Sequence, residues 1–233
     1  MFPRADFCSR RGRHGLSFRV RGRCQRRAWS FHGNAGLSTK QRILDAALEL
    51  FNAEGVAALS AVDIAAALSM SPGHLYYHFK GKPEILAHLA EAYQGEVELV
   101  IEAALEACHG AGASLETLWT HVHILAEEAW DARFLYREAG ALALRHPDLA
   151  ARIRRITAAE REALRAMLTN MQAAGAIAAS AEVIDGLSRL MTTGIGFHAI
   201  QLELEGDPGP PRARVARAAA QIMLLPAGLA RGI

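Results

Sequence analysis

Long apolar runs are absent from this chain of 233 residues, although 51% of its residues are hydrophobic. Charged residues interrupt the apolar segments, and no stretch approaches the roughly 18 consecutive apolar residues that a membrane-spanning helix needs. Cysteines are scarce as well, since only Cys8, Cys24 and Cys108 occur, odd in number and far apart. That spacing indicates neither a disulfide framework nor a zinc site. We therefore predict a protein of the reducing cytoplasm without membrane segment, metal or cofactor.

Strand patterns are missing too. No segment alternates apolar and polar residues between turn residues, and alanine and leucine recur at helical spacing from residue 37 onward. The first helix is expected to begin at Ser38 or Thr39 and to stop at Gly55. One apolar stripe runs along it, made of Ile43, Ala47, Leu50 and Phe51. These patterns predict an all-α fold.

Capping residues, glycines and prolines divide the chain into about nine expected helices. Ser60 and Asp63 have the spacing of a capping box at the start of the second helix, and Ser71 is the expected cap of the third. The longer helices are expected over residues 82–108, 114–130, 132–145, 148–174, 180–204 and 211–229. This order predicts an arm over residues 1–37, a small three-helix domain over 38–84 and a larger helical body over 85–233.

The arm differs in charge from everything that follows it. Residues 1–37 contain nine arginines and a single acid, Asp6, which gives the segment a charge of +8. Because the whole chain carries +2, the remainder carries −6. Two interpretations stay open: a disordered arm that neutralises phosphates or enters a minor groove, and a solvated tail or upstream sequence translated from a wrongly chosen start.

Motifs of catalysis are not found. The chain has no nucleophile elbow, no phosphate-cradling glycine loop, no HExxH pair and no acid pair converging on an obvious pocket. We therefore do not expect an enzyme.

The stretch SPGHLYYHFKGK, from Ser71 to Lys82, carries the densest group of rings in the chain. A helix advances by about 100° per residue, so Phe79 falls above Leu75 while Tyr77 falls on the opposite side. Two apolar anchors and an outward face of hydrogen-bonding side chains suit a short helix that enters a major groove. The alternative is an ordinary surface helix, but exposing two adjacent tyrosines without a partner is uncommon.

Together with ILDAALELFNAEG and SAVDIAAALSMS before it, this stretch resembles the DNA-binding domain of the TetR/AcrR family of bacterial transcriptional regulators. The resemblance covers residues 38–86, and its most specific part runs from Ser71 through Gly73, Leu75, Tyr76 and Phe79 to Lys82. One position departs from the family pattern, because Ser69 stands where the family usually has a glycine in the turn. Serine adopts a turn conformation less easily than glycine does.

The resemblance implies an all-α protein of about nine helices, with a helix-turn-helix DNA-binding domain over 38–84 and a ligand-binding and dimerisation domain over 85–233. By resemblance, Tyr76 and Lys82 would contact phosphates, and Tyr77, His74 and Gly73 would face the bases. The full predicted DNA-binding set is Thr39, Lys40, Ser60, Ala61, Ser71, Pro72, Gly73, His74, Tyr76, Tyr77, His78 and Lys82. The partners implied are an operator duplex, a small effector and a second copy of the chain, in the bacterial cytoplasm.

The body supplies candidates for the other two sites. Rings with a few polar groups between helices suit a small-molecule cavity, and we predict a pocket formed by Trp119, His123, Glu127, Trp130, Phe134 and Tyr136. His123 and Glu127, four residues apart, are expected to share a hydrogen bond. Glycines inside the penultimate helix indicate close helix packing, so the last two helices are the expected dimer surface. Its candidates are Met191, Gly194, Ile195, Phe197, His198, Ile222 and Leu225.

Two functions remain to be separated. The preferred hypothesis is a ligand-responsive repressor that binds a palindromic operator as a homodimer. The alternative is a helical binding or scaffold protein whose basic arm does not read duplex sequence.

Overall fold

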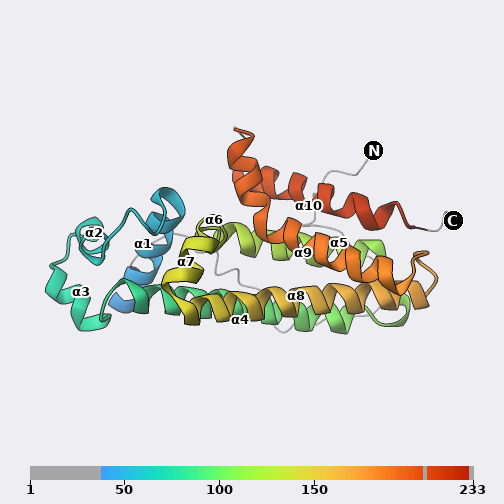
Figure 1. The fold of residues 1–233 in the computed structure, drawn as a ribbon, viewed down its shortest axis with the longest axis horizontal. Helices are drawn as coiled ribbons and strands as arrows, with labels where there is room; N and C mark the ends of the chain where they lie inside the picture. The colour runs from blue at the N-terminus through green and yellow to red at the C-terminus, as the bar shows by residue number, and fades with distance from the viewer. Residues whose placement is uncertain (1–37, 207–208, 231–233) are drawn as a thin grey trace, which may run out of the picture. The chain divides into compact units, whose positions relative to one another are not determined.

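The computed structural model of the protein describes residues 38–206 and 209–230. The predicted arm, residues 1–37, therefore lies outside the described residues. Within the described ranges the chain forms ten α-helices and one 3₁₀ turn, and all of them belong to one unit of the fold (Figure 1). Their bounds are α1 Thr39–Glu54, α2 Ala61–Ala67, α3 Pro72–His78, α4 Lys82–Ala107, η1 Gly110–Gly112, α5 Leu115–Asp131, α6 Phe134–Arg137, α7 Ala139–Arg145, α8 Pro147–Ala173, α9 Ala181–Leu204 and α10 Pro211–Ala227. The all-α prediction is confirmed.

Side-chain caps define the first three helices. The Ser38 hydroxyl accepts the N–H of Gln41 at the start of α1, and Gly55 ends the helix with a φ of +89°. Ser60 and Asp63 cap each other's backbone at the start of α2, as the sequence predicts. This hydrogen bonding from Ser60 also lowers the pKa of the Asp63 carboxyl. Together with Ser71, whose hydroxyl accepts the N–H of His74 at the start of α3, these caps show that local sequence determines where the first three helices begin.

The turn between α2 and α3 contains the departure from the family pattern. Ser69 has a φ of +53° and is the one non-glycine residue with positive φ in the described part of the chain. A side chain in this left-handed region is strained, whereas glycine is not. The backbone therefore keeps the turn that a glycine favours, at a cost in conformational energy.

The body is built around α4 and α8, which pack along each other as Figure 1 shows. α5 packs against α4 and α10, and α9 packs against α8 and α10. The buried side chains between them are mostly leucine, isoleucine, methionine and alanine, among them Leu89, Leu118, Leu164, Met167, Leu168, Met171, Met191 and Ile195. No helix of the described residues is long and apolar enough to cross a membrane.

One expected helix is divided in two. The prediction of a continuous helix over 132–145 is wrong, because α6 ends at Arg137 and α7 begins at Ala139. Between them Glu138 leaves helical geometry, with a φ of −115° and a ψ of 23°. Its carboxylate accepts hydrogen bonds from the backbone of Val56 and Ala57, in the turn after α1. The other long helices lie within two residues of their expected bounds.

Candidate nucleic-acid interface

Helix α3 presents two tyrosines to solvent. The exposed fraction is 83% for Tyr77 and 50% for Tyr76, whereas Leu75 is 0% and Phe79 1% exposed. Leu75 and Phe79 therefore anchor α3 against the rest of the domain, as the helical spacing predicts. An outward tyrosine gains nothing from the core, so its ring and hydroxyl are free to meet another molecule.

The neighbours of Tyr77 form a ring cluster on the same short helix. The ring of His78 lies 5.1 Å from that of Tyr77, edge to face, and 5.3 Å from that of His74. Gly73 lies beside this cluster, and a Cβ atom built there would meet nothing within 4 Å. Internal packing therefore does not require a glycine at this position, which leaves close approach of a ligand as a reason for it.

The other predicted contact residues differ in accessibility. Ser71, Pro72, Ser60 and Lys40 are exposed, whereas Ala61 is only 7% exposed. The Ser71 hydroxyl accepts the N–H of His74 as the N-cap of α3, and Thr39 is half-buried in the first turn of α1. The ammonium of Lys40 lies 5.3 Å from the centre of the Phe79 ring. Lys40, at the start of α1, thus lies close to the residue that ends α3.

Lys82 is engaged inside the protein. Its ammonium donates hydrogen bonds to the carbonyl oxygens of Val56 and Leu59, at 2.8 and 2.6 Å. Lysine has three N–H donors, so one is left for a phosphate. Lys82 thereby joins the start of α4 to the turn before α2, a structural role that sequence inspection does not reveal.

A set of polar contacts missed by the sequence analysis connects α1 to α6. The Asn52 side chain donates to the carbonyl of Asp131 at 2.7 Å and accepts the N–H of Phe134 at 3.0 Å. The guanidinium of Arg137 donates to the carbonyl of Asn52 at 2.7 Å. We call these contacts, with those of Glu138, the α1–α6 junction. A polar Asn52 beside Phe51 on the buried face of α1 was the available signal.

The six residues predicted for a pocket are not gathered around one cavity. Trp119 and His123 stack along α5 with their ring centres 5.0 Å apart, and the His123 and Glu127 side chains are 3.7 Å apart. That distance suits an ion pair and exceeds a hydrogen bond, so the expected bond is wrong. Trp130 lies under the guanidinium groups of two arginines, each 4.8 Å from its ring, namely Arg133 and Arg214.

The remaining two, Phe134 and Tyr136, are buried side chains of α6. Phe134 is buried against Phe51 of α1, with ring centres 5.8 Å apart. The Tyr136 hydroxyl is 2.8 Å from that of Tyr93, which in turn lies 3.5 Å from the carboxylate of Glu160. Burial raises the pKa of Glu160 to about 8. Tyr136 is thus the pocket candidate that joins α4, α6 and α8.

The dimer candidates fall into a buried and an exposed group. Met191, Ile195, His198 and Ile222 are each no more than 9% exposed, whereas Phe197 is 46% and Leu225 47% exposed. Two glycines of α9, Gly194 and Gly196, do serve close packing, but within the chain. A Cβ at Gly194 would lie 2.9 Å from Ile222, and one at Gly196 2.6 Å from Tyr136.

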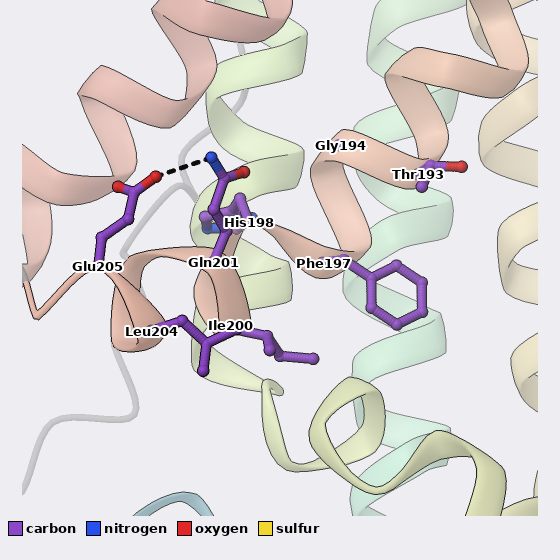
Figure 2. Close-up of a pocket in the computed structure, with 8 residues that line it drawn as sticks. All are labelled: Thr193, Gly194, Phe197, His198, Ile200, Gln201, Leu204 and Glu205. Carbon is purple, nitrogen blue, oxygen red and sulfur yellow. Dashed lines mark hydrogen bonds between the residues drawn. The ribbon is translucent and has the colours of Figure 1, made fainter.

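A hollow of about 450 Å³ lies on the outer side of α9 (Figure 2). It is lined by Thr193, Gly194, Phe197, His198, Ile200, Gln201, Leu204 and Glu205. Figure 2 shows these side chains on α9 and its C-terminal end, where Gln201 donates to Glu205. Because a single helix supplies its wall, the hollow is open on the side away from the protein.

Together, a turn that leads into a short helix with buried anchors and an exposed ring cluster defines a protein of the helix-turn-helix DNA-binding class. Residues 43–89 match the family model described as bacterial regulatory proteins of the tetR family, and residues 96–231 match the model of a bacterial transcriptional repressor named TetR. The chain belongs to the TetR family of bacterial transcriptional regulators.

Curated relatives match a limited part of the chain. The regulator AcrR of Shigella flexneri is 41% identical over 68 residues, which is 28% of this chain and 32% of the relative. SrpR of Pseudomonas putida is 43% identical over 61 residues, 26% of this chain and 29% of the relative. The chain thus spans about a third of the length of these relatives.

Solved structures extend the likeness to the body. A TetR-family regulator from Marinobacter aquaeolei VT8 aligns with a TM-score of 0.72 at 22% identity, covering 84% of this chain and 92% of the other. The ketosteroid transcriptional regulator KstR2 of Mycobacterium tuberculosis gives 0.67 at 18% identity, covering 86% and 98%. SmeT, the repressor of the Stenotrophomonas maltophilia multidrug efflux pump SmeDEF, gives 0.59 at 20% identity, covering 83% and 91%. At these identities the likeness establishes the fold.

Proposed function

We propose that this protein is a ligand-responsive repressor that binds a palindromic operator as a homodimer in the bacterial cytoplasm. The observation that carries the proposal is the exposure of Tyr77. Its side chain is 83% exposed, although Leu75 and Phe79 anchor the opposite face of the same helix in the core. Tyr77, His74 and Gly73 face the base edges in this proposal, while Tyr76 and the free N–H of Lys82 contact phosphates. All twelve predicted DNA-binding residues remain part of the proposed interface. Ala61 is buried, so in this proposal only its backbone can contact the DNA.

The charge of the DNA-binding domain limits its affinity. Residues 38–82 contain the cations Lys40, Arg42, Lys80 and Lys82 and the anions Asp45, Glu49, Glu54 and Asp63, so the segment is neutral. Because neutralisation of phosphates supplies most nonspecific affinity, a neutral domain needs cations from elsewhere. The nine arginines of residues 1–37 are the candidates in this proposal.

The proposed dimer uses the exposed faces of α9 and α10. Val183, Leu190, Phe197 and Leu204 recur every seven residues on α9 and are 45%, 59%, 46% and 85% exposed. On α10, Leu224 is 70% and Leu225 47% exposed. Two copies related by a two-fold axis would bury these stripes as a four-helix interface. Met191, Gly194, Ile195, His198 and Ile222 support that interface from behind, by holding α9 on the body.

Ligand response requires that an effector prefer one arrangement of the two domains. The body contacts the DNA-binding domain through α4 and through the α1–α6 junction. Of the proposed pocket residues, Tyr136 is the best placed, because it lies on α6 and reaches Tyr93 of α4. We propose that an effector which displaces Tyr136 moves α6 and so changes the position of α3.

The test is binding of the full chain to the DNA that flanks its own gene. Fluorescence anisotropy at moderate salt is expected to show saturable binding to one duplex, with competition by that duplex and not by a scrambled one. Light scattering should give the mass of two chains, and Phe197→Glu should reduce it to one. Equal affinity for both duplexes would favour the scaffold alternative instead.

A further inference from the structure

A groove of about 430 Å³ lies where the first turns of α4 meet the corner between α7 and α8. Its apolar lining includes Leu86 and Leu149, which are 1% and 6% exposed, together with Pro83, Ala87 and Ala151. The volume falls in the range of small-molecule sites. None of the residues predicted for the effector pocket or the DNA interface lines it.

The rim of this groove is basic. Arg145, Arg152 and Arg155 line it, against the single acid Asp148. Among the described residues, no carboxylate lies within ion-pair distance of these three guanidinium groups, whereas Arg137 is held by Glu203 at 3.1 Å. Arg152 donates instead to the neutral side-chain oxygen of Gln94 at 2.6 Å. Three guanidinium groups thus gather on one apolar groove beside a single acid, and none of the three forms an ion pair among the described residues.

We propose that this groove binds an amphipathic organic anion. A guanidinium presents a planar fork that fits the two oxygens of a carboxylate or phosphate. The acid group would lie between Arg145 and Arg155, and Arg152 would add a further donor. The apolar part of the ligand would cover Leu86 and Leu149 on the floor of the groove. Removing this apolar surface from water would favour binding.

Occupancy of the groove has a consequence for α3. Helix α4 begins at Lys82, three residues after Phe79, the buried anchor of α3. A molecule wedged between the first turns of α4 and the start of α8 alters how α4 rests on α8, and its acid group cancels positive charge next to the DNA-binding domain. Both effects weaken the affinity for DNA. This second half of the proposal rests on the proposed function, whereas binding to the groove does not.

Three probes with the same chain length separate charge from hydrophobicity. Decanoate and decyl phosphate are anionic, and decyltrimethylammonium is cationic. Calorimetric titration of the full chain, below the concentration at which the probes aggregate, is expected to show one site per chain for the two anions and none for the cation. Binding of the cation with similar affinity would overturn the assignment.

The variants locate the site. Arg155→Gln is expected to weaken decanoate binding about tenfold, because it removes a charge-assisted hydrogen bond. Arg154→Gln is the matched control, since Arg154 is exposed, lies one residue away on α8 and does not line the groove. The affinity of Arg154→Gln for decanoate should stay within about twofold of that of the wild type. Ala87→Trp keeps every charge but fills the groove, and should abolish binding while thermal melting stays cooperative.

Equal losses in Arg154→Gln and Arg155→Gln, or unchanged binding in Ala87→Trp, would show that the groove is not the site. The regulatory half is tested by adding decanoate to the complex with DNA, which should raise the apparent Kd for wild type and Arg154→Gln and leave it unchanged for Ala87→Trp. Binding without any effect on DNA affinity would refute that half. Absence of specific DNA binding without any probe would instead refute the proposed function, and calorimetry would still decide the groove.

Discussion

The carboxylate of Glu138 accepts the backbone N–H of Val56 at 2.6 Å, across 82 positions of the sequence. Its second oxygen accepts the N–H of Ala57 at 3.1 Å. Only a glycine fits at position 55, because a Cβ atom there would lie 2.5 Å from the same carboxylate. A single side chain at the α6–α7 break therefore holds the turn that follows α1.

Replacing this carboxylate should loosen the connection between the two domains. Glu138→Ala leaves the N–H of Val56, which is 3% exposed, without a partner, and we expect a loss of about 1–3 kcal/mol in the free energy of unfolding. Urea denaturation measures it. Glu102→Ala, at an exposed position of α4, is the control and should change the value by less than about 0.5 kcal/mol. Equal losses of unfolding free energy in Glu138→Ala and Glu102→Ala would mean that the hydrogen bonds of Glu138 do not stabilise the protein.

Tyr77→Ala should abolish selective DNA binding and leave the fold intact. The side chain is 83% exposed, so its removal should change the free energy of unfolding by less than about 0.5 kcal/mol. Anisotropy with the specific and the scrambled duplex measures the selectivity. The control is Leu144→Ala, which truncates a side chain that is 87% exposed and should leave DNA binding unchanged. A large drop in melting temperature for Tyr77→Ala would show that the ring supports the fold.

Local signals account for the parts of the structure that the sequence predicts well. Ser38, Ser60 and Ser71 each accept a backbone N–H at a predicted helix start. The spacing of Leu75 and Phe79 identified the buried face of α3, because a short helix with two anchors has only one way to face a core. Each of these inferences involves residues no more than four positions apart.

Long-range contacts account for what the sequence analysis missed. Nothing near Glu138 indicates a helix break, since its partner Val56 is 82 positions away. Aromatic residues in helices look alike whether they line a cavity or fill a core, so Phe134 and Trp130 could not be sorted by pattern. Likewise, Arg145 at the end of α7 and Arg155 of α8 line one groove with Leu86 of α4 through tertiary packing, which no local pattern indicates.

Ser69→Gly should stabilise the protein. Ser69 occupies the left-handed region with a φ of +53°, which glycine adopts without steric cost. After allowing for the greater freedom of glycine in the unfolded chain, we expect a gain of about 0.5–1 kcal/mol in the free energy of unfolding. Urea denaturation measures it, with Ser69→Ala as the control, which should show no gain. A gain for alanine as well would mean that the hydroxyl, and not the backbone, is the source.

Glu160 is a buried acid in the middle of the body. It is 0% exposed, one of its oxygens has no hydrogen-bond partner among the described residues, and the other lies 3.5 Å from the Tyr93 hydroxyl. Burial raises its pKa from 4.5 to about 8, although the bond from Tyr93 opposes the rise. The folded protein therefore holds this proton between about pH 4.5 and 8, while the unfolded chain has released it. The free energy of unfolding should fall as the pH rises through that window.

Glu160→Gln should remove this part of the pH dependence. The amide cannot ionise, so the variant should match the wild type near pH 4.5 and exceed it by up to about 3 kcal/mol at pH 7. Some slope should remain, because burial also raises the pKa of Glu128 to about 7 and that of Asp131 to about 6. Urea denaturation from pH 4.5 to 8.5 measures both curves, with the exposed Glu102→Gln as control. Parallel curves for wild type and Glu160→Gln would mean that Glu160 stays ionised in the folded protein, with an unseen partner for its charge.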